Sequence, residues 1–231
     1  MIEDIKIKGN KVLESMASVG LHFGAPRSRR HPSTKAFSFG VKNDIEIIDL
    51  EKTLVGLDKV KEFVKKLAGE GKKFMLVGNK SEARDAVEKA GEKADLPWVA
   101  LRWIGGTLTN FDEIRKRVDR LADLETKGAS GELGKYTKKE RARIGHEVKD
   151  LKRFFSGIIN MSQLPSAMFV IDSDKEAIAI TEAKKINIPV ISLSSTDCDI
   201  SLVDFPIVGN DKSAGSIKFI VEQIVEAYRG K

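Results

Sequence analysis

From residue 73 onward, short apolar runs alternate with segments in which apolar residues recur at helical spacing. The apolar runs occupy residues 73–78, 98–103, 167–172, 188–193 and 204–208. The helical patterns occupy residues 81–94, 175–185 and 213–228. Continuous apolar strands that alternate with helices are typical of a parallel sheet covered by helices on both faces. The pattern therefore predicts an α/β fold.

One connection is far longer than the dozen or so residues that a parallel crossover needs. Residues 111–158 separate the second predicted strand from the third and contain two apolar seams, joined by a glycine-bearing turn. The seams consist of Phe111, Ile114, Val118 and Leu121, and of Ile144, Val148, Leu151 and Phe155. Two helices with narrow seams and a short link fold back on each other. We therefore expect an antiparallel coiled-coil hairpin that projects from the sheet domain.

The stretch LRWIGGTLTN, residues 101–110, leads from the second strand into this hairpin. Gly105 and Gly106 are expected to let the chain turn sharply, since glycine adopts conformations closed to other residues. Thr109 or Asn110 is expected to cap the first hairpin helix. Further along, the spacing of Thr137 and Glu140 predicts a capping box at the start of the second hairpin helix.

Two side chains in the same stretch could serve either structure or binding. Trp103 is expected to pack at the base of the hairpin rather than to stack on a nucleic-acid base. Arg102 has two open interpretations, because its guanidinium could support the turn through backbone carbonyls or reach a phosphate. A second capping box is expected at Ser173 and Glu176, which would place Asp172 and Asp174 at a helix start.

Composition and charge restrict the partner and the compartment of the protein only moderately. The 231 residues include 40 Lys and Arg against 34 Asp and Glu, which gives a formal charge of +6 and a pI near 9.2. A basic protein of this kind suits a polyanionic partner without requiring one. The single cysteine, Cys198, permits no internal disulfide and favours a reducing compartment. The first ten residues, MIEDIKIKGN, lack the features of a secretory signal.

The uncharged run at residues 154–171 is the one segment that needs a membrane check. It contains a proline, an asparagine, a glutamine and three serines, whereas a spanning helix needs about 20 mainly apolar residues. We interpret it as a helix end, a turn and a buried strand.

Positive charge is concentrated near the amino end. Residues 15–43 contain no acid and five fixed cations, and their glycines and prolines predict a loop or extended arm. The cations are Arg27, Arg29, Arg30, Lys35 and Lys42. Clustered arginines are suited to bidentate contacts with phosphate. The hairpin, residues 111–158, is also basic, with thirteen Lys and Arg against nine acids; its surface is either an ordinary solvated coiled coil or a second contact for RNA phosphates.

A search for enzyme chemistry gives no positive signal. No G-x-G-x-x-G or phosphate-loop motif follows a predicted strand, and the three histidines are scattered. The run TDCDI at 196–200, together with Asp204, offers mixed metal ligands at an unconvincing spacing. We expect no catalytic residue, no cofactor and no metal site. Two alternatives stay open: a nucleotide enzyme or sensor at the sheet edge near Gly78, Lys80 and Asp172, and a free-standing protein-binding module built on the hairpin.

Five stretches together resemble a known family. VGLHFGAPRSRRHP, IEIIDLEKT, LRWIGGTLTNF, YTKKE and LPSAMFVIDSDKEAIAITEAKKINIPVI occur in the order and spacing of the bacterial ribosomal S-two family, the second protein of the small ribosomal subunit. The resemblance covers the chain from about residue 9 to the final helix. The sequence departs from the family pattern at Ala25, at His31 and in STDCDI, where the usual proline is missing.

The resemblance implies a flavodoxin-like, three-layer α/β domain with an inserted coiled-coil hairpin and no catalytic activity. It also implies a cytoplasmic ribosomal constituent that docks on 16S ribosomal RNA between the head and the body of the small subunit. Its neighbours would be other small-subunit proteins, among them, in some bacteria, the largest mRNA-binding small-subunit protein. The expected division is an N-terminal helix and basic arm at 1–43, an α/β domain at 44–110 and 159–231, and the hairpin at 111–158.

The expected RNA contacts combine this resemblance with the charge pattern. They comprise the basic residues near the amino end, two residues of the turn before the hairpin and two lysines at the start of its second helix. These are Arg27, Arg29, Arg30, Lys35, Lys42, Arg102, Asn110, Lys138 and Lys139.

Overall fold

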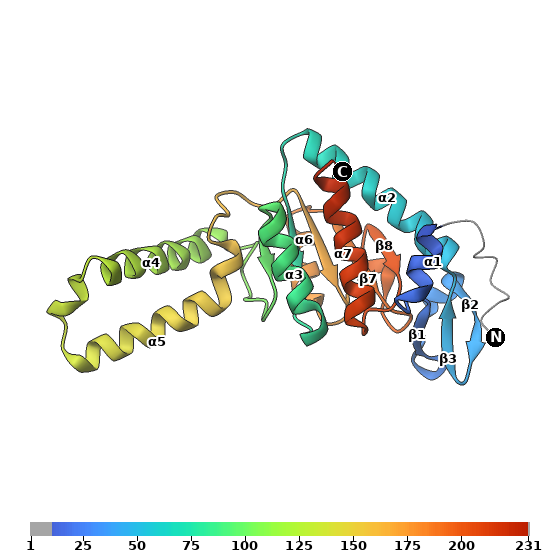
Figure 1. The fold of residues 1–231 in the computed structure, drawn as a ribbon, viewed down its shortest axis with the longest axis horizontal. Coiled ribbons are helices and arrows are strands. Elements are labelled where there is room, and N and C mark those ends of the chain that lie inside the picture. The colour runs from blue at the N-terminus through green and yellow to red at the C-terminus, as the bar shows by residue number, and fades with distance from the viewer. Residues whose placement is uncertain (1–10, 231) are drawn as a thin grey trace.

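The computed structural model describes residues 11–230. The expectation that the chain has no secretory signal depends on residues 1–10, which lie outside this range. Three parts can be distinguished in Figure 1: a central α/β body, a helical hairpin at one end of the long axis and a small antiparallel sheet at the other end. The first helix, α1 (Lys11–Ser18), packs against the body on the side of the small sheet.

The body is built on a five-stranded sheet with the order β5-β4-β6-β7-β8 in which every pair is parallel. Its strands are β4 (Phe74–Val77), β5 (Trp98–Val99), β6 (Ala167–Ile171), β7 (Val190–Ser194) and β8 (Phe205–Val208). All residues of β4, β6 and β7 are buried. This burial explains their unbroken apolar sequences, and it confirms the predicted parallel α/β fold. The second predicted strand is shorter than expected, since it ends at Val99.

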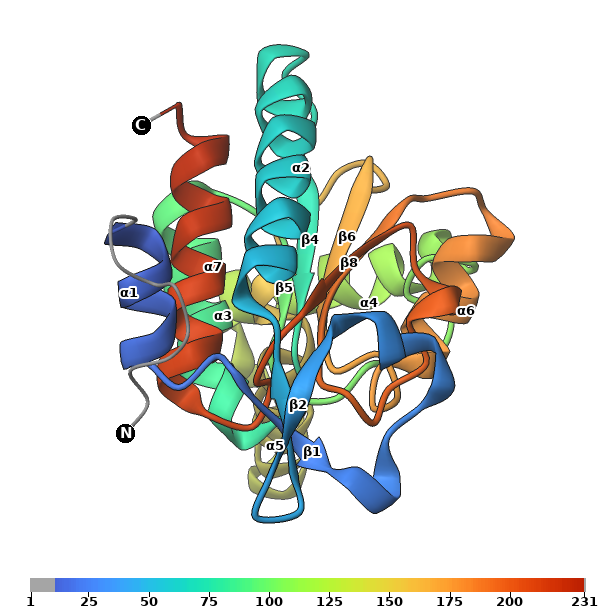
Figure 2. The same cartoon turned by 90° about the vertical axis from the view of Figure 1, so that its right-hand side faces the viewer.

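Alternate residues of each strand face two separate cores. Phe74 and Leu76 face α2 (Leu50–Gly69), α3 (Ser81–Ala94) and α7 (Ala214–Tyr228). Met75 and Val77 face α6 (Ala177–Lys185) together with the base of the hairpin. Figure 2 shows the first group of helices on one side of the sheet and α6 on the other. The arrangement confirms the three layers that the resemblance implies.

The hairpin consists of α4 (Phe111–Ala129), a short 3₁₀ turn at Glu132–Lys135 and α5 (Lys138–Phe155). Figure 1 shows both helices projecting far beyond the sheet. The base of the hairpin is packed against the body, because Ile114 and Val118 of α4 and Phe155 of α5 belong to the core that covers the sheet. Residues 132–144 are half-buried or exposed. The predicted antiparallel hairpin is therefore confirmed, with its base built into the body.

The basic stretch near the amino end is not the loop or extended arm that its glycines and prolines predicted. It forms β1 (Phe23–Pro26), two 3₁₀ turns at Arg27–Arg29 and Pro32–Phe37, and β2 (Ser38–Lys42). Both strands pair with β3 (Ile45–Ile48) in an antiparallel sheet of order β1-β3-β2. Asn43 and Asp44, with φ of 50° and 60°, make the two-residue turn between β2 and β3, as such hairpins require.

The uncharged run at 154–171 is confirmed as a helix end, a 3₁₀ turn (Ser156–Ile158) and the buried strand β6. Across residues 11–230, no helix combines the length and apolar character needed to cross a membrane. The capping box at Ser173 and Glu176 was a wrong prediction. The carboxylate of Asp172 instead accepts hydrogen bonds from the backbone N–H groups of Asp174 and Lys175, and α6 begins only at Ala177.

Candidate nucleic-acid interface

The cations near the amino end sit on a folded platform. We call residues 27–42 the basic segment. His31 N donates to the carbonyl of Thr196 at 2.8 Å, and the hydroxyl of Thr34 donates to the same carbonyl at 2.8 Å. His31 Nδ1 also contacts Ser33 at 2.8 Å. Because these bonds join the segment to the loop after β7, its cations are held in fixed positions on the body.

Four of the five cations are available to a partner. Arg27, Arg29, Lys35 and Lys42 are all exposed. None of the four forms an ion pair with any residue between 11 and 230. Their charges are therefore free to meet an anion, and their contact with RNA phosphates stays a prediction.

Arg30 differs from the other four, which the sequence did not indicate. Its Nη1 lies 2.9 Å from Oε1 of Glu46, a fully buried residue of β3. The other oxygen of Glu46 accepts a hydrogen bond from the hydroxyl of Ser38. Arg30 is thus neutralised within the fold. Residues 15–43 contain no acid, but the antiparallel pairing of β2 with β3 places Glu46 next to Arg30.

The small sheet also exposes apolar side chains beside these cations. Phe23 of β1, Phe39 and Val41 of β2 and Ile45 of β3 are between 38% and 61% exposed. Large exposed apolar groups on a monomer mark surfaces for a partner. The small sheet and the basic segment therefore present exposed cations and exposed apolar side chains together.

The turn before the hairpin is organised by a buried carboxylate. Glu182 of α6 is 7% exposed, and its Oε1 accepts hydrogen bonds from Trp103 Nε1 at 3.1 Å and Gly106 N at 2.8 Å. Its Oε2 accepts one from Leu108 N at 3.1 Å, and longer bonds of 3.4 Å from the backbone and the hydroxyl of Thr109. Burial opposes ionisation, but these N–H donors outweigh it and lower the pKa of Glu182.

These contacts decide several predictions for the turn. Trp103 is 6% exposed and packs in the core between the sheet and the hairpin, as expected. Gly106 has φ of 91°, which favours glycine, whereas Gly105 has no positive φ and open space around its Cα. The role given to Gly105 is therefore not supported. Asn110 occupies the N-cap position of α4, but its side chain makes no capping bond. The hydroxyl of Thr109 does not cap the helix either, because it donates to Glu182.

Arg102 is exposed, and its side chain has no hydrogen bond or ion pair with the described residues. The interpretation in which it supports the turn is therefore wrong for this structure. Its contact with a phosphate stays a prediction, as does that of the exposed Asn110.

The hairpin divides into a paired stem and an open tip. Ion pairs connect α4 and α5 near the middle, where Arg120 meets Glu147 at 3.2 Å and Lys152 meets Glu125 at 2.6 Å. Towards the tip, five exposed cations lack an ion pair to any residue from 11 to 230. These are Lys135, Lys138, Lys139, Arg141 and Arg143. The capping box of Thr137 and Glu140 is confirmed, with both of its bonds formed.

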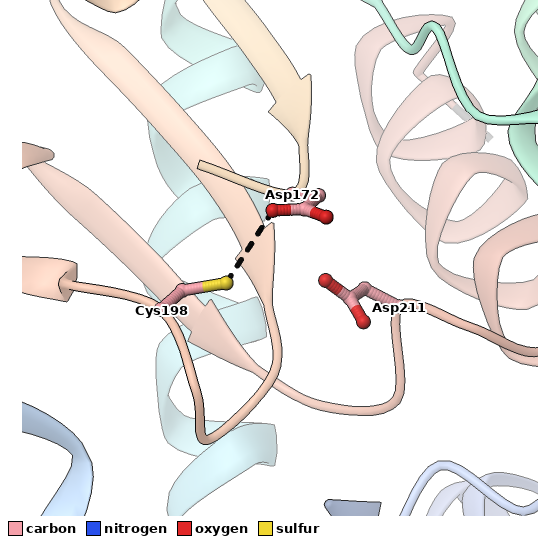
Figure 3. Close-up of side chains that lie close together, drawn as sticks. All are labelled: Asp172, Cys198 and Asp211. Atoms are coloured by element: carbon pink, nitrogen blue, oxygen red, sulfur yellow. Dashed lines mark hydrogen bonds between the residues drawn. The ribbon is translucent and has the colours of Figure 1, made fainter. Parts of the chain in front are cut away.

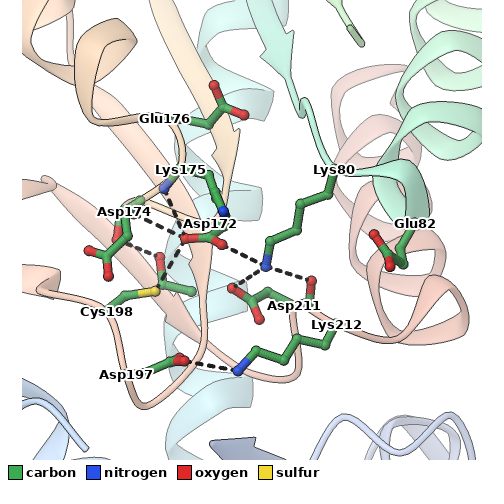
Figure 4. A network of polar contacts seen from close by, with 12 residues as sticks. Lys80, Glu82, Asp172, Asp174, Lys175, Glu176, Asp197, Cys198, Asp211 and Lys212 are labelled. Carbon is green, nitrogen blue, oxygen red and sulfur yellow. Dashed lines mark hydrogen bonds and ion pairs between the residues drawn. The ribbon is translucent and has the colours of Figure 1, made fainter. Parts of the chain in front are cut away.

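The sheet edge proposed for the nucleotide alternative contains an internal ion-pair network, shown in Figure 4. Lys80 Nζ lies 2.6 Å from Asp172 Oδ2 and 3.1 Å from Asp211 Oδ2. Burial opposes the charge of Lys80, but Asp211 and Asp172 outweigh it and raise its pKa. Burial raises the pKa of Asp211 to about 6. Two buried carboxylates would repel the phosphates of a nucleotide, and the lysine is already neutralised by them.

A neighbouring buried carboxylate at the same sheet edge has fewer hydrogen-bond donors to replace its lost hydration. Glu176 is 1% exposed and accepts hydrogen bonds from the backbone and side-chain N–H groups of Asn79, each at 2.8 Å. Burial raises the pKa of Glu176 to about 7, because two donors do not replace the lost hydration.

Comparison with known proteins agrees with this architecture. The profile of the ribosomal protein S2 family matches residues 16–230. The chain belongs to the ribosomal protein S2 family. It is 42% identical over 214 residues to small ribosomal subunit protein uS2 of Thermus thermophilus, covering 93% of this chain and 84% of the relative. It is 40% identical over 216 residues to the uS2 protein of Bdellovibrio bacteriovorus, covering 94% and 69% respectively. The S2 family consists of structural proteins and not of enzymes.

Sequence reasoning missed the two glutamates that organise both regions. Glu182 lies between Ile180 and Ala183 on the buried stripe of α6, and Glu46 alternates with Ile45 and Ile47 so that it shares the buried side of Ile48. An acid at an apolar position of a periodic pattern is the local signal that could have identified them.

Proposed function

We propose that this chain is a structural constituent of the small ribosomal subunit that binds 16S ribosomal RNA with the basic segment and the hairpin tip. The cations of the segment that remain free, Arg27, Arg29, Lys35 and Lys42, would contact phosphates. Arg102, Asn110, Lys138 and Lys139 would add contacts at and beyond the base of the hairpin. The single observation that carries the proposal is a set of exposed cations, held on a rigid platform, without internal counter-charges.

The placement of the two basic surfaces supports a bridging role. Figure 1 places the small sheet and the hairpin tip at opposite ends of the molecule. A rigid body with a phosphate-binding surface at each end is suited to joining two RNA segments, which fits a position at the head–body junction of the subunit. Phosphate contacts position a protein without reading sequence, so we infer no base code for the hairpin.

The apolar side chains of the small sheet are assigned to protein neighbours. Phe39 is 61% exposed, and a phosphate backbone offers it little apolar surface to contact. A neighbouring small-subunit protein would cover it, and in some bacteria the largest mRNA-binding small-subunit protein is a candidate for this partner. The cytoplasm, as the site of the ribosome, is part of the same proposal.

The test is the salt dependence of binding to 16S RNA or to subunits lacking this protein. Replacing Arg27 and Arg29 with alanine should weaken binding and reduce the slope of log K against log salt by about 1.4 to 1.8, since each lost phosphate contact contributes roughly 0.7 to 0.9. A double alanine variant of Lys65 and Lys66, two exposed lysines of α2, removes the same charge elsewhere and serves as the control. Equal slopes in the two variants would refute the assignment of the interface.

A further inference from the structure

Three buried side chains with metal-ligating atoms meet at the carboxyl edge of the parallel sheet. Asp172 follows β6, Cys198 lies in the loop after β7 and Asp211 lies in the loop after β8. They are 7%, 2% and 1% exposed. One ligand atom of each lies within 4.8 Å of the other two, and Figure 3 shows the three side chains converging on one space. Carboxyl ends of parallel strands are where α/β folds place ligands.

A second observation is an oxygen that the fold does not satisfy. Asp211 Oδ1 is buried and has no hydrogen-bond partner among residues 11–230. The other carboxylate oxygen of Asp211 is 3.1 Å from Lys80 Nζ. Because a lost hydrogen bond to a buried oxygen is costly, such atoms are rare unless a water or an ion meets them.

The charges around the cluster leave a deficit of positive charge. Asp172 and Asp211 face the single ammonium of Lys80, while the adjacent Asp197 is already paired with Lys212 at 2.8 Å. One negative charge is therefore uncompensated. A divalent cation bound to two carboxylates and a thiolate, beside that ammonium, would make the sum zero. The thiol proton would pass to solvent, as metal binding by cysteine requires.

The cluster is also held in place before any ligand arrives. Asp172 has φ of 71°, a left-handed conformation that is uncommon outside glycine. Its Oδ1 is fixed by the backbone N–H groups of Asp174 and Lys175 at 3.0 and 3.2 Å, and Cys198 Sγ lies 3.5 Å from the same oxygen. Hydrogen bonds from groups outside the ligand set orient a ligand atom before a metal binds.

We propose that Asp172, Cys198 and Asp211 form a binding site for one zinc-class divalent transition-metal ion, with a water as fourth ligand. A thiolate selects such ions over magnesium and calcium, which take oxygen ligands only. A tetrahedral zinc ion holds its ligand atoms roughly 3.5 Å apart, so the loops carrying Cys198 and Asp211 would close by about 1 Å. Sequence spacing could not indicate the site, because its three ligands come from three separate loops.

The test uses the full-length chain, freed of metal with a chelator and titrated with Co²⁺ as a spectroscopic substitute for Zn²⁺. One equivalent should produce thiolate-to-cobalt charge-transfer absorption, and Zn²⁺ should displace it. Cys198→Ser should abolish the band and weaken Zn²⁺ binding by at least about tenfold, measured by calorimetry. Asp211→Asn should weaken it similarly; if that variant fails to fold, the one-atom change at Cys198 still decides.

Two further variants separate a metal site from a simple ion-pair cluster. Asp197→Asn, an acid adjacent to the site but outside the ligand set, should lower the affinity far less than Asp211→Asn does. Lys80→Met should raise the affinity, because it removes a positive charge next to the metal. Absence of the band at one equivalent, its persistence in Cys198→Ser, or a fall in affinity for Lys80→Met would each overturn the proposal. None of these outcomes depends on RNA binding.

Discussion

The small sheet and the hairpin lie at opposite ends of the molecule, and the buried glutamate found at each end is satisfied in a different way. Glu46 in the small sheet pairs with a cation, Arg30, and so removes one positive charge from the surface. Glu182 at the base of the hairpin is satisfied only by N–H and O–H donors and uses no cation. The buried glutamate of the small sheet therefore consumes a cation that the sequence leaves without a nearby acid, whereas Glu182 consumes none.

Glu176 adds an intermediate case between these two. It has neither a cation nor a full set of donors, since only Asn79 donates to it. Burial raises the pKa of Glu176 to about 7, with Asp172 adding to the rise, whereas the donors around Glu182 outweigh its burial and lower its pKa. The three glutamates thus differ in the donors and charges around each carboxylate. Replacing each with glutamine tests how much stability depends on that difference.

The largest effect is expected for Glu182→Gln. Both carboxylate oxygens of Glu182 accept from donors, so an amide NH₂ in place of either oxygen would face N–H groups and leave them unsatisfied. Each buried donor without a partner costs on the order of 1 to 3 kcal/mol, which predicts a loss of about 3 kcal/mol in the free energy of unfolding. Urea denaturation measures it. A loss below about 1 kcal/mol would show that the turn does not depend on this carboxylate.

Glu176→Gln should instead change how stability depends on pH. A carboxyl whose pKa is higher in the folded protein than in the unfolded chain binds its proton more tightly when folded. Its contribution is complete below about pH 4.5 and is lost as the pH rises towards 7. The glutamine is neutral throughout, and Asn79 can accept from its NH₂ because Asn79 Oδ1 is buried without a partner.

Between pH 4.5 and 8, the wild-type chain should accordingly lose about 2 to 3 kcal/mol more stability than Glu176→Gln. Urea denaturation at several pH values gives both curves. Taking the difference between them cancels the other titrating groups, including Asp211. Parallel curves would mean that Glu176 is ionised in the folded protein at neutral pH.

A smaller loss is expected for Glu46→Gln. The amide oxygen can still accept from Arg30, and its NH₂ can donate to Ser38, whose hydroxyl both donates and accepts. What is lost is the charge on one hydrogen bond, so the free energy of unfolding should fall by about 1 to 2 kcal/mol. If it falls as far as in Glu182→Gln, the distinction between the two carboxylates fails.

These cases also show which features the sequence predicts and which it does not. The five strands of the parallel sheet, the helices α3, α6 and α7 and the hairpin are specified by local periodicity, and the structure confirms them. The small sheet and α2 were not predicted. The capping box at Thr137 and Glu140 is confirmed for the same reason, since its partners are three residues apart. The Arg30–Glu46 pair and the contacts of Glu182 join residues that only the tertiary fold brings together, so no local spacing reveals them.

Ambiguity within a motif is a second limit on prediction. The two glycines at 105 and 106 are identical in sequence, but the left-handed conformation occurs only at Gly106. Thr109 could cap a helix by its chemistry, yet the nearby carboxylate of Glu182 offers it a different acceptor. Which of several competent residues performs a role is decided by neighbours that a local pattern does not contain.

The smallest change in stability is expected at the hairpin tip, where no buried glutamate consumes the charge. Lys138 and Lys139 are exposed and have no ion pair within the described chain. Replacing both with alanine should leave the unfolding midpoint unchanged, because both residues remain in a helix that alanine favours. If the tip contacts RNA phosphates, the slope of log K against log salt for 16S RNA should nonetheless fall by about 1.4 to 1.8. An unchanged slope would make the tip an ordinary solvated coiled coil and leave the small sheet as the main electrostatic contact.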